Sequence, residues 1–249
     1  FWFPGTYLTI AKYFGMRNRI VGGVALFSML IAGFVLDYFK NTKIFLGFII
    51  LFGISFIFRS ISALLFLKKY EPELVLKKEY HFSFRQFIKK MPKNNFGKFV
   101  IFVSLMQFAT AVASPFFTVY LLKDLSFSYI KWMLIIVSSS LSSLIFMPFW
   151  GKFADRYGNV KVVKICSPLI SAIPLLWLVV ALNIFNPLIY LIIVEISSGI
   201  VWAGFNLSST NFIYDAVTRQ RMAICVAYFN VLQGIGVFIG ASIGGMISS

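Results

Sequence analysis

Seven long apolar runs limit what this chain can fold into more than any other feature of its sequence. An α-helix needs about 20 mostly apolar residues to cross a bilayer. Part of a helix is expected at residues 1–15, followed by spans at 20–39, 44–67, 99–122, 130–149, 160–182, 188–217 and 222–247. The sequence therefore predicts an all-α fold, a polytopic membrane helix bundle.

The composition agrees with a protein that exposes apolar surface to lipid. Hydrophobic residues make up 59% of the chain and charged residues only 12%, whereas an ordinary soluble domain carries about 25% charged residues. The surplus apolar surface requires a bilayer. We therefore expect an integral, multi-pass protein, and we place it in the plasma membrane.

Basic residues account for the net charge of +15, and they gather in the connections between the apolar runs. Alternate connections hold 18 of the 23 Lys and Arg residues, the other connections hold four, and Arg59 lies inside a span. The positive-inside rule places the basic-rich connections in the cytoplasm. A nucleic-acid partner would need a basic face instead, so we expect none.

A short polar hairpin, Gly151-Lys-Phe-Ala-Asp-Arg-Tyr-Gly-Asn-Val-Lys161, separates two of the expected spans. We expect Gly151 to permit close helix approach, and Asp155 to cap or charge-complement the start of the following helix. Gly158 suits the left-handed backbone of a tight turn. Arg156 and Lys161 are expected to hold the turn at the phosphate-rich face of the membrane.

This hairpin pattern, G-x-x-x-D-R-x-G-x-x-K, resembles the loop signature of the major facilitator superfamily of secondary transporters. Asn159 and Val160 stand where the usual motif continues with basic residues. The resemblance implies a cytoplasmic latch between helices, in which Asp155 and Arg156 bias one conformation by charge pairing. The remaining expected members of the latch are Gly151, Gly158, Lys161, Arg219 and Arg221, with the two arginines as partners for Asp155 or Asp215.

An internal repeat points to the same family. A shift of 202 residues sets 16–30 on 218–232, and it aligns Arg17 with Arg219 and Arg19 with Arg221. An even number of spans separates the two copies, so both cross the membrane in the same direction. Parallel six-helix halves are typical of major facilitator transporters.

This resemblance implies a division of the chain into three parts. Residues 1–67 would end the first six-helix half, 68–98 would be a cytoplasmic linker, and 99–249 would form the second half without its last span. The chain is thus expected to be a piece covering about the fourth to the eleventh span of a twelve-span protein. Phe82, Phe84, Phe87 and Ile88 in the linker fit either a short amphipathic helix on anionic headgroups or a solvated linker.

Glu195 is the most notable ionisable residue inside an expected span, where a charge is costly. Helical spacing places Glu195, Ser198, Trp202, Asn206 and Ser209 on one face. Such a polar stripe is expected to face the protein interior or a water-filled cavity. Glu195 is then either a proton carrier or substrate anchor, or a partner in a helix-packing hydrogen bond, and the sequence leaves both open.

Other polar residues in spans are weaker candidates. Arg59 is expected to reach the headgroups or pair across the bundle, although an anionic-substrate site on it stays open. The resemblance places Gln107, Asn230 and Gln233 near the family's central cavity, which makes them candidates for solute contact. The serines at 138–143 and the ladder of Gly236, Gly240 and Gly244 are expected to be close-packing surfaces instead.

We therefore interpret the chain as a secondary active transporter that moves a small solute by alternating access, with proton coupling as a hypothesis. The alternative is a receptor or sensor on a transporter scaffold. An enzyme is not expected, because paired carboxylates, a metal cluster and an intramembrane His are missing from the sequence, and His81 lies in a polar loop. No cofactor or metal is expected, and the protein is expected to be a monomer in the lipid bilayer.

Overall fold

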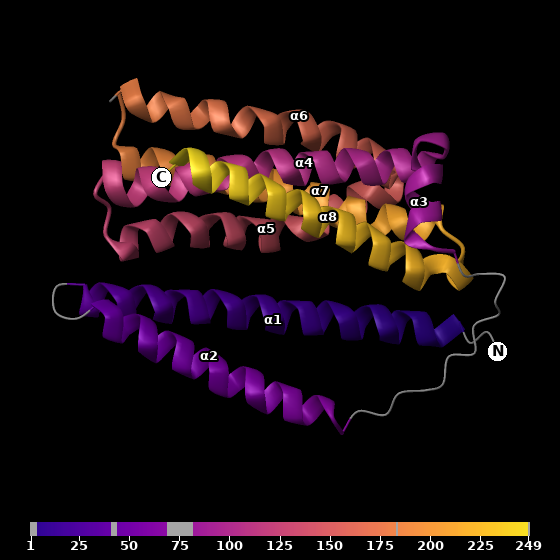
Figure 1. The fold of residues 1–249 in the computed structure, drawn as a ribbon, viewed down its shortest axis with the longest axis horizontal. Coiled ribbons are helices and arrows are strands. Elements are labelled where there is room, and N and C mark those ends of the chain that lie inside the picture. Colours follow the sequence, from indigo (N-terminus) through magenta and orange to yellow (C-terminus); the bar gives the residue numbers. More distant parts are fainter. Residues whose placement is uncertain (1–3, 41–43, 69–81, 183, 249) are drawn as a thin grey trace. The chain divides into compact units, whose positions relative to one another are not determined.

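Helices make up nearly all of the computed structural model, which describes residues 4–40, 44–68, 82–182 and 184–248 (Figure 1). The helices are α1 (Pro4–Phe39), α2 (Ile44–Phe66), α3 (Phe84–Lys90), η2 (Met91–Lys93), α4 (Asn95–Val119), η3 (Tyr120–Asp124), α5 (Tyr129–Tyr157), α6 (Asn159–Leu178), η4 (Val179–Leu182), α7 (Pro187–Ala216) and α8 (Arg219–Ser248). Of these, η3 is a π-helical turn that continues α4, and η2 and η4 are short 3₁₀ turns.

Seven stretches among the described residues are long and apolar enough to span a membrane, and they confirm the predicted helix bundle. Their bounds are Ile20–Phe39, Ile44–Phe66, Asn95–Asp124, Tyr129–Tyr157, Asn159–Leu182, Pro187–Ala216 and Gln220–Ile247. Each overlaps one of the spans expected from the apolar runs. The largest difference is at the end of α5, which continues eight residues beyond the predicted 149.

The first helix differs from the prediction. A partial helix at residues 1–15 and a separate span from 20 were expected, but α1 runs without a break from Pro4 to Phe39. Arg17, Asn18 and Arg19 are compatible with a helix, and no proline or turn dipeptide accompanies them. In the second copy of the repeat, the β-branched pair Val217 and Thr218 lies in the break between α7 and α8.

Contacts group the chain into two compact units. The first contains α1, α2 and the segments Phe127–Pro148 and Leu175–Ala203. The second contains α3, α4, α8, the segment Phe149–Pro174 and residues 204–216.

Glycines on α8 pack directly against the backbone of α4 in the second unit. A Cβ atom added at Gly236 would lie 2.9 Å from the carbonyl oxygen of Ser104, and one at Gly240 would lie 2.5 Å from that of Phe108. Gly244 approaches the carbonyl oxygen of Val112 in the same way. Any side chain here would push the helices apart, as in other small-residue membrane interfaces. The prediction of a close-packing glycine ladder is confirmed.

A comparable close approach joins α5 and α7 in the first unit. A side chain at Gly199 would collide with the backbone of Ser139 and the hydroxyl of Ser142. The Ser142 hydroxyl lies 3.0 Å from the carbonyl oxygen of Ile196, to which it donates a hydrogen bond. The serine run at 138–143 therefore packs helices together, as predicted.

Of the two alternatives left open for the linker, the short helix is present as α3, and its Phe84 and Phe87 pack on protein. Ser83 and Gln86 form a reciprocal capping box at its start. The Tyr228 hydroxyl of α8 donates a 2.8 Å hydrogen bond to the carbonyl oxygen of Phe82. The Tyr228 ring also contacts the rings of Phe84 and Phe87, with centroids 5.2 and 5.4 Å away. Residues 69–81 of the expected linker lie outside the described residues.

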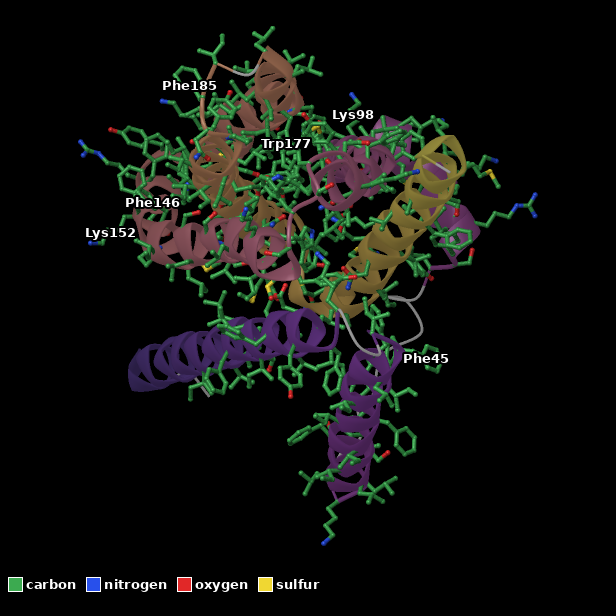
Figure 2. All side chains as sticks on the ribbon, turned by 90° about the vertical axis from the view of Figure 1, so that its left-hand side faces the viewer. Phe45, Lys98, Phe146, Lys152, Trp177 and Phe185 are labelled. Atoms are coloured by element: carbon green, nitrogen blue, oxygen red, sulfur yellow. The ribbon has the colours of Figure 1, made fainter. Side chains whose placement is uncertain are left out.

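Large apolar side chains stay exposed on many helix surfaces. Phe45 on α2 is 75% exposed and Phe185, before α7, is 61% exposed, and both project away from the ribbon in Figure 2. A soluble protein rarely leaves so much contiguous apolar surface in water. These faces are suited to lipid contact.

Candidate functional site

Glu195 is the centre of a polar cluster on α7. The residue lies eight positions after Pro187, the first residue of the helix, which corresponds to about 12 Å along the helix axis. The side chains of Ser139 on α5 and Trp177 on α6 are polar groups that lie near its carboxyl group. Trp177 is buried, with 7% of its surface exposed, and Glu195 is half-buried. Three helices of the first unit therefore converge on one carboxyl group.

Positive charge is missing from the central stretches of the helices that surround this carboxyl group. The sequence has no Lys, Arg or His between Lys131 and Lys152, which covers most of α5, or between Lys164 and Arg219, which covers most of α6 and α7. Ser139 and Trp177 supply neutral hydrogen-bond donors only. These stretches therefore offer Glu195 no basic side chain as a partner, and a bound proton or a bound cation would compensate its charge.

The other members of the predicted stripe differ in exposure along α7. Ser198 and Ser209 are buried and Trp202 is half-buried, whereas Asn206 is exposed. Ser198 is adjacent to Gly199, which packs on α5. The stripe is therefore partly a packing surface, and Glu195 is the member for which the structure provides polar partners from two other helices.

The candidates on α4 and α8 lie in the second unit. Gln107 and Gln233 are half-buried, and Asn230 is exposed. No hydrogen bond found among the described side chains joins these three residues to one another. Their role as solute contacts stays a prediction.

The hairpin at 151–161 is a helix for most of its length, which corrects the predicted loop. α5 continues to Tyr157 and α6 begins at Asn159, so Gly158 alone separates the two helices. Gly158 has a φ of +87°, which confirms the predicted left-handed conformation. Its N–H donates a 2.7 Å hydrogen bond to the carbonyl oxygen of Ala154, which ends α5.

Two expected roles in the hairpin are not borne out. Asp155 lies in the last turn of α5 and is exposed, so it does not cap α6, whereas its charge complementation of the α6 start stays a prediction. Gly151 is not required for close helix approach, since a Cβ there would lie at an ordinary distance of 3.8 Å from Leu207. Arg156 and Lys161 lie over the Tyr157 ring, at 5.3 and 4.8 Å from its centroid.

Asn159 provides the hairpin's polar link to another helix. Its side-chain amide donates a 2.7 Å hydrogen bond to the carboxylate of Asp215, near the end of α7. The pairing of Asp155 or Asp215 with Arg219 and Arg221 stays a prediction. The Arg219 side chain lies outside the described residues, and Arg221 is exposed.

Sequence reasoning missed three of these residues. Asn159 was interpreted only as a departure from a basic motif, and Ser139 only as part of a packing run. Trp177 lies five residues before the end of its span, where a tryptophan usually marks the membrane interface. The sequence alone does not distinguish a tryptophan at the membrane interface from one that lies near Glu195.

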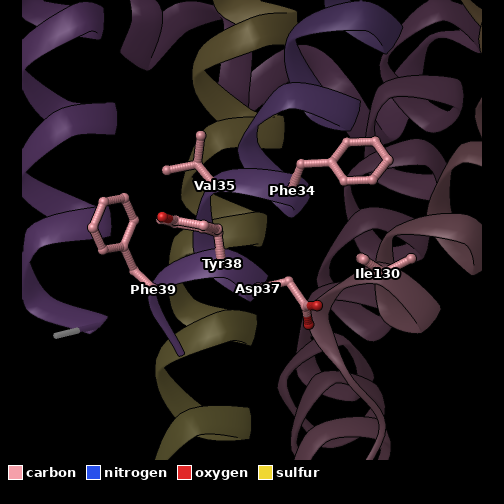
Figure 3. A pocket seen from close by; sticks show the side chains of 6 residues that line it. All are labelled: Phe34, Val35, Asp37, Tyr38, Phe39 and Ile130. Atoms are coloured by element: carbon pink, nitrogen blue, oxygen red, sulfur yellow. The ribbon is translucent and has the colours of Figure 1, made fainter. Parts of the chain in front are cut away.

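A small cavity near the end of α1 is a poorer candidate site. It measures 460 Å³ and is lined by Phe34, Val35, Asp37, Tyr38 and Phe39 of α1 and by Ile130 of α5 (Figure 3). Asp37 is its one charged lining residue among those described. With mainly apolar neighbours around a single carboxylate, the cavity offers no arrangement of polar groups that would select a solute.

The sequence profile of the Major Facilitator Superfamily matches residues 99–249, from the first turns of α4 through the end of α8. The chain belongs to the Major Facilitator Superfamily. Seven span-length helices among the described residues make this major facilitator protein an integral, multi-pass membrane protein of a transporter type. Searches among curated proteins and among solved structures found no match.

Proposed function

We propose that this major facilitator protein is a secondary active transporter that moves a small solute by alternating access, with Glu195 on the path of a proton or a cationic solute. The observation that supports this proposal is the carboxyl group of Glu195, which has polar partners on α5 and α6. The same helices carry no basic residue near it. A residue in this environment is suited to bind a proton or cation reversibly.

The layout of the transporter is part of the proposal. Residues 1–67 end a first six-helix half, 68–98 form the cytoplasmic linker, and 99–249 belong to the second half. The packing of α4 on α8 through Gly236, Gly240 and Gly244 supports a firmly assembled second half. Alternating access then requires the two halves to move as bodies around a shared solute site.

The hairpin serves in this proposal as a conformational latch. The hydrogen bond between Asn159 and Asp215 ties the start of α6 to the end of α7. A latch that stabilises one of two conformations by only a few kcal/mol shifts the equilibrium between them strongly. Asp155, Arg156 and Arg221 are exposed, and we propose that they pair in one of the two states.

The experiment that tests this function is flux into proteoliposomes with an imposed pH gradient. Solutes are screened as labelled mixtures, and uptake is compared between the wild-type protein and Glu195→Gln, which keeps the size of the side chain and removes its charge. We expect gradient-driven uptake in the wild type and its loss in the variant. Wild-type protein that binds a solute without moving it would instead be a receptor, and unchanged gradient-driven uptake by the variant would remove Glu195 from the pathway.

A further inference from the structure

A second cavity, distant in sequence from Glu195, lies within the second unit between the linker helix and the ends of two spans. It measures 780 Å³ and is lined by α3, the start of α4, the end of α7 and the start of α8. Figure 1 shows α3 beside the starts of α4 and α8. This volume is within the range of about 300–1,000 Å³ that is usual for small-molecule sites. The positive-inside rule places this end of the spans in the cytoplasm.

The charge around this cavity is positive. Lys90, from the last turn of α3, and Arg221, from the first turn of α8, both line it. None of the described lining residues carries a carboxylate. The N-terminal ends of α4 and α8 also point their partial positive charge toward this region, since Asn95 begins α4 and Thr218 precedes α8. Two cations and two helix N-termini favour an anion.

Hydrogen-bond donors are available among the lining residues. Asn94 caps α4 through its side-chain oxygen, and the Gln86 side-chain oxygen accepts from the Ser83 N–H. The side-chain amides of Gln86 and Asn95 and the hydroxyl of Thr218 are further lining groups that can donate. Several donors beside two cations suit the oxygens of a phosphate group.

The rest of the lining is apolar and held in place. Phe87 is 6% exposed, and its ring contacts those of Phe96 and Tyr228. Phe212 is packed against Phe99, with ring centroids 4.3 Å apart. Phe87, Phe96 and Phe212 all line the cavity. An occupant therefore meets both apolar rings and positive charge.

From this arrangement we propose that the cavity binds an amphiphilic phosphate, a molecule that joins a phosphate group to an apolar body. Lys90 and Arg221 bind the phosphate, and the phenylalanines contact the apolar body. The ligand thus connects the linker helix to α8. Two sources have this chemistry, the headgroup region of an anionic membrane lipid and a soluble phosphate ester.

The test measures binding to the purified, full-length protein in a neutral detergent by isothermal titration calorimetry. Dioctanoyl phosphatidic acid is the lipid probe, phenyl phosphate is the soluble probe, and dioctanoylglycerol has the lipid body without the phosphate. We expect saturable binding of at least one phosphate probe and at least tenfold weaker binding of dioctanoylglycerol. Binding of the lipid probe alone assigns the site to a membrane lipid, and comparable binding of phenyl phosphate assigns it to a soluble ester.

Variants locate the binding in this cavity. Lys90→Gln combined with Arg221→Gln is expected to weaken binding about tenfold or more. The matched control, Lys89→Gln combined with Lys93→Gln, removes the same charge from exposed positions of the same segment that do not line the cavity. Ala216→Trp keeps both charges and fills the space, and it is also expected to abolish binding. Thermal unfolding of each variant checks that it is folded.

Three results would overturn the proposal. The first is no saturable binding of either phosphate probe to the wild-type protein. The second is binding of dioctanoylglycerol as tight as that of the phosphate probes. The third is an equal loss of binding in the Lys89 and Lys93 control, which would indicate general surface attraction rather than a site.

Discussion

The side-chain amide of Asn159 donates a hydrogen bond to the carboxylate of Asp215 across 2.7 Å. The two residues are 56 positions apart and join the first residue of α6 to the last turn of α7. Gly158 makes this contact possible, because its φ of +87° turns the chain within a single residue. The turn at Gly158 and the hydrogen bond of Asn159 therefore hold the start of α6 beside the end of α7.

The first prediction concerns this contact. Asn159→Ala and Asp215→Ala are each expected to lower the free energy of unfolding by about 1 kcal/mol, as is usual for one hydrogen bond. The double variant should cost less than the sum of the two, because both changes remove the same interaction. Thermal unfolding in detergent measures all three. Lys152→Ala, at an exposed position on α5, is the control, and strictly additive effects would contradict the contact.

The second prediction separates the partners of Glu195. Ser139→Ala and Trp177→Phe each remove one hydrogen-bond donor near the carboxyl group, and each is expected to reduce gradient-driven uptake about fivefold, the equivalent of about 1 kcal/mol. Ser138→Ala is the matched control, since that hydroxyl donates to the carbonyl oxygen of Ile135 within α5. An equal effect of Ser138→Ala would assign the loss to the packing of α5.

The third prediction uses two neighbouring glycines of α8. A methyl group at Gly244 would meet the carbonyl oxygen of Val112, whereas one at Gly245 would meet nothing within 4 Å. Gly244→Ala is therefore expected to destabilise the protein by about 1–3 kcal/mol through overpacking. Gly245→Ala should be neutral or slightly stabilising, because alanine favours a helix. Thermal unfolding distinguishes them, and equal melting temperatures would contradict the close packing of α4 on α8.

The fourth prediction concerns the docking of the linker helix. Tyr228→Phe removes only the hydrogen bond to the carbonyl oxygen of Phe82, and it should speed amide exchange in α3 about fivefold. Tyr228→Ala also removes the ring contacts with Phe84 and Phe87, so its effect should be much larger. Hydrogen-exchange mass spectrometry measures both. Tyr214→Ala, at a 59% exposed tyrosine of α7, should leave α3 unchanged.

The fifth prediction concerns orientation. Cysteines introduced at Lys93, in the linker, and at Ile184, before α7, are both at exposed positions. We expect the first to react with an impermeant thiol reagent only from the cytoplasmic side and the second only from outside. The native Cys166 and Cys225 are buried, which limits background labelling. Reaction of both sites from the same side of intact cells would overturn the span layout.

Most of the fold could be predicted from the sequence, because the bilayer allows few solutions. A long apolar run in lipid has to satisfy its backbone hydrogen bonds internally, and a helix does so. All seven spans were found in this way. The helix boundary within the repeat was harder to predict, because the two copies differ. Arg17 and Arg19 lie within an unbroken α1, whereas Arg219 begins a new helix.

Less of the candidate site could be predicted. Glu195 stood out because a carboxyl group inside a span is costly, but its partners Ser139 and Trp177 have no distinguishing pattern. The place of Asp155 after an apolar run predicts a helix cap, yet α5 continues past it to Tyr157. A charged helical turn that extends beyond the membrane has the same composition as a loop.

The amino-acid order alone therefore specifies the membrane-spanning helices, their number and the position of Glu195 inside its span. These features follow from local composition and from the thickness of a bilayer. Which side chains meet depends on how the helices pack. The contacts of Asn159 with Asp215 and of Tyr228 with Phe82 bridge 56 and 146 positions. Such partners are selected by shape and polarity in three dimensions, which no local pattern in the chain encodes.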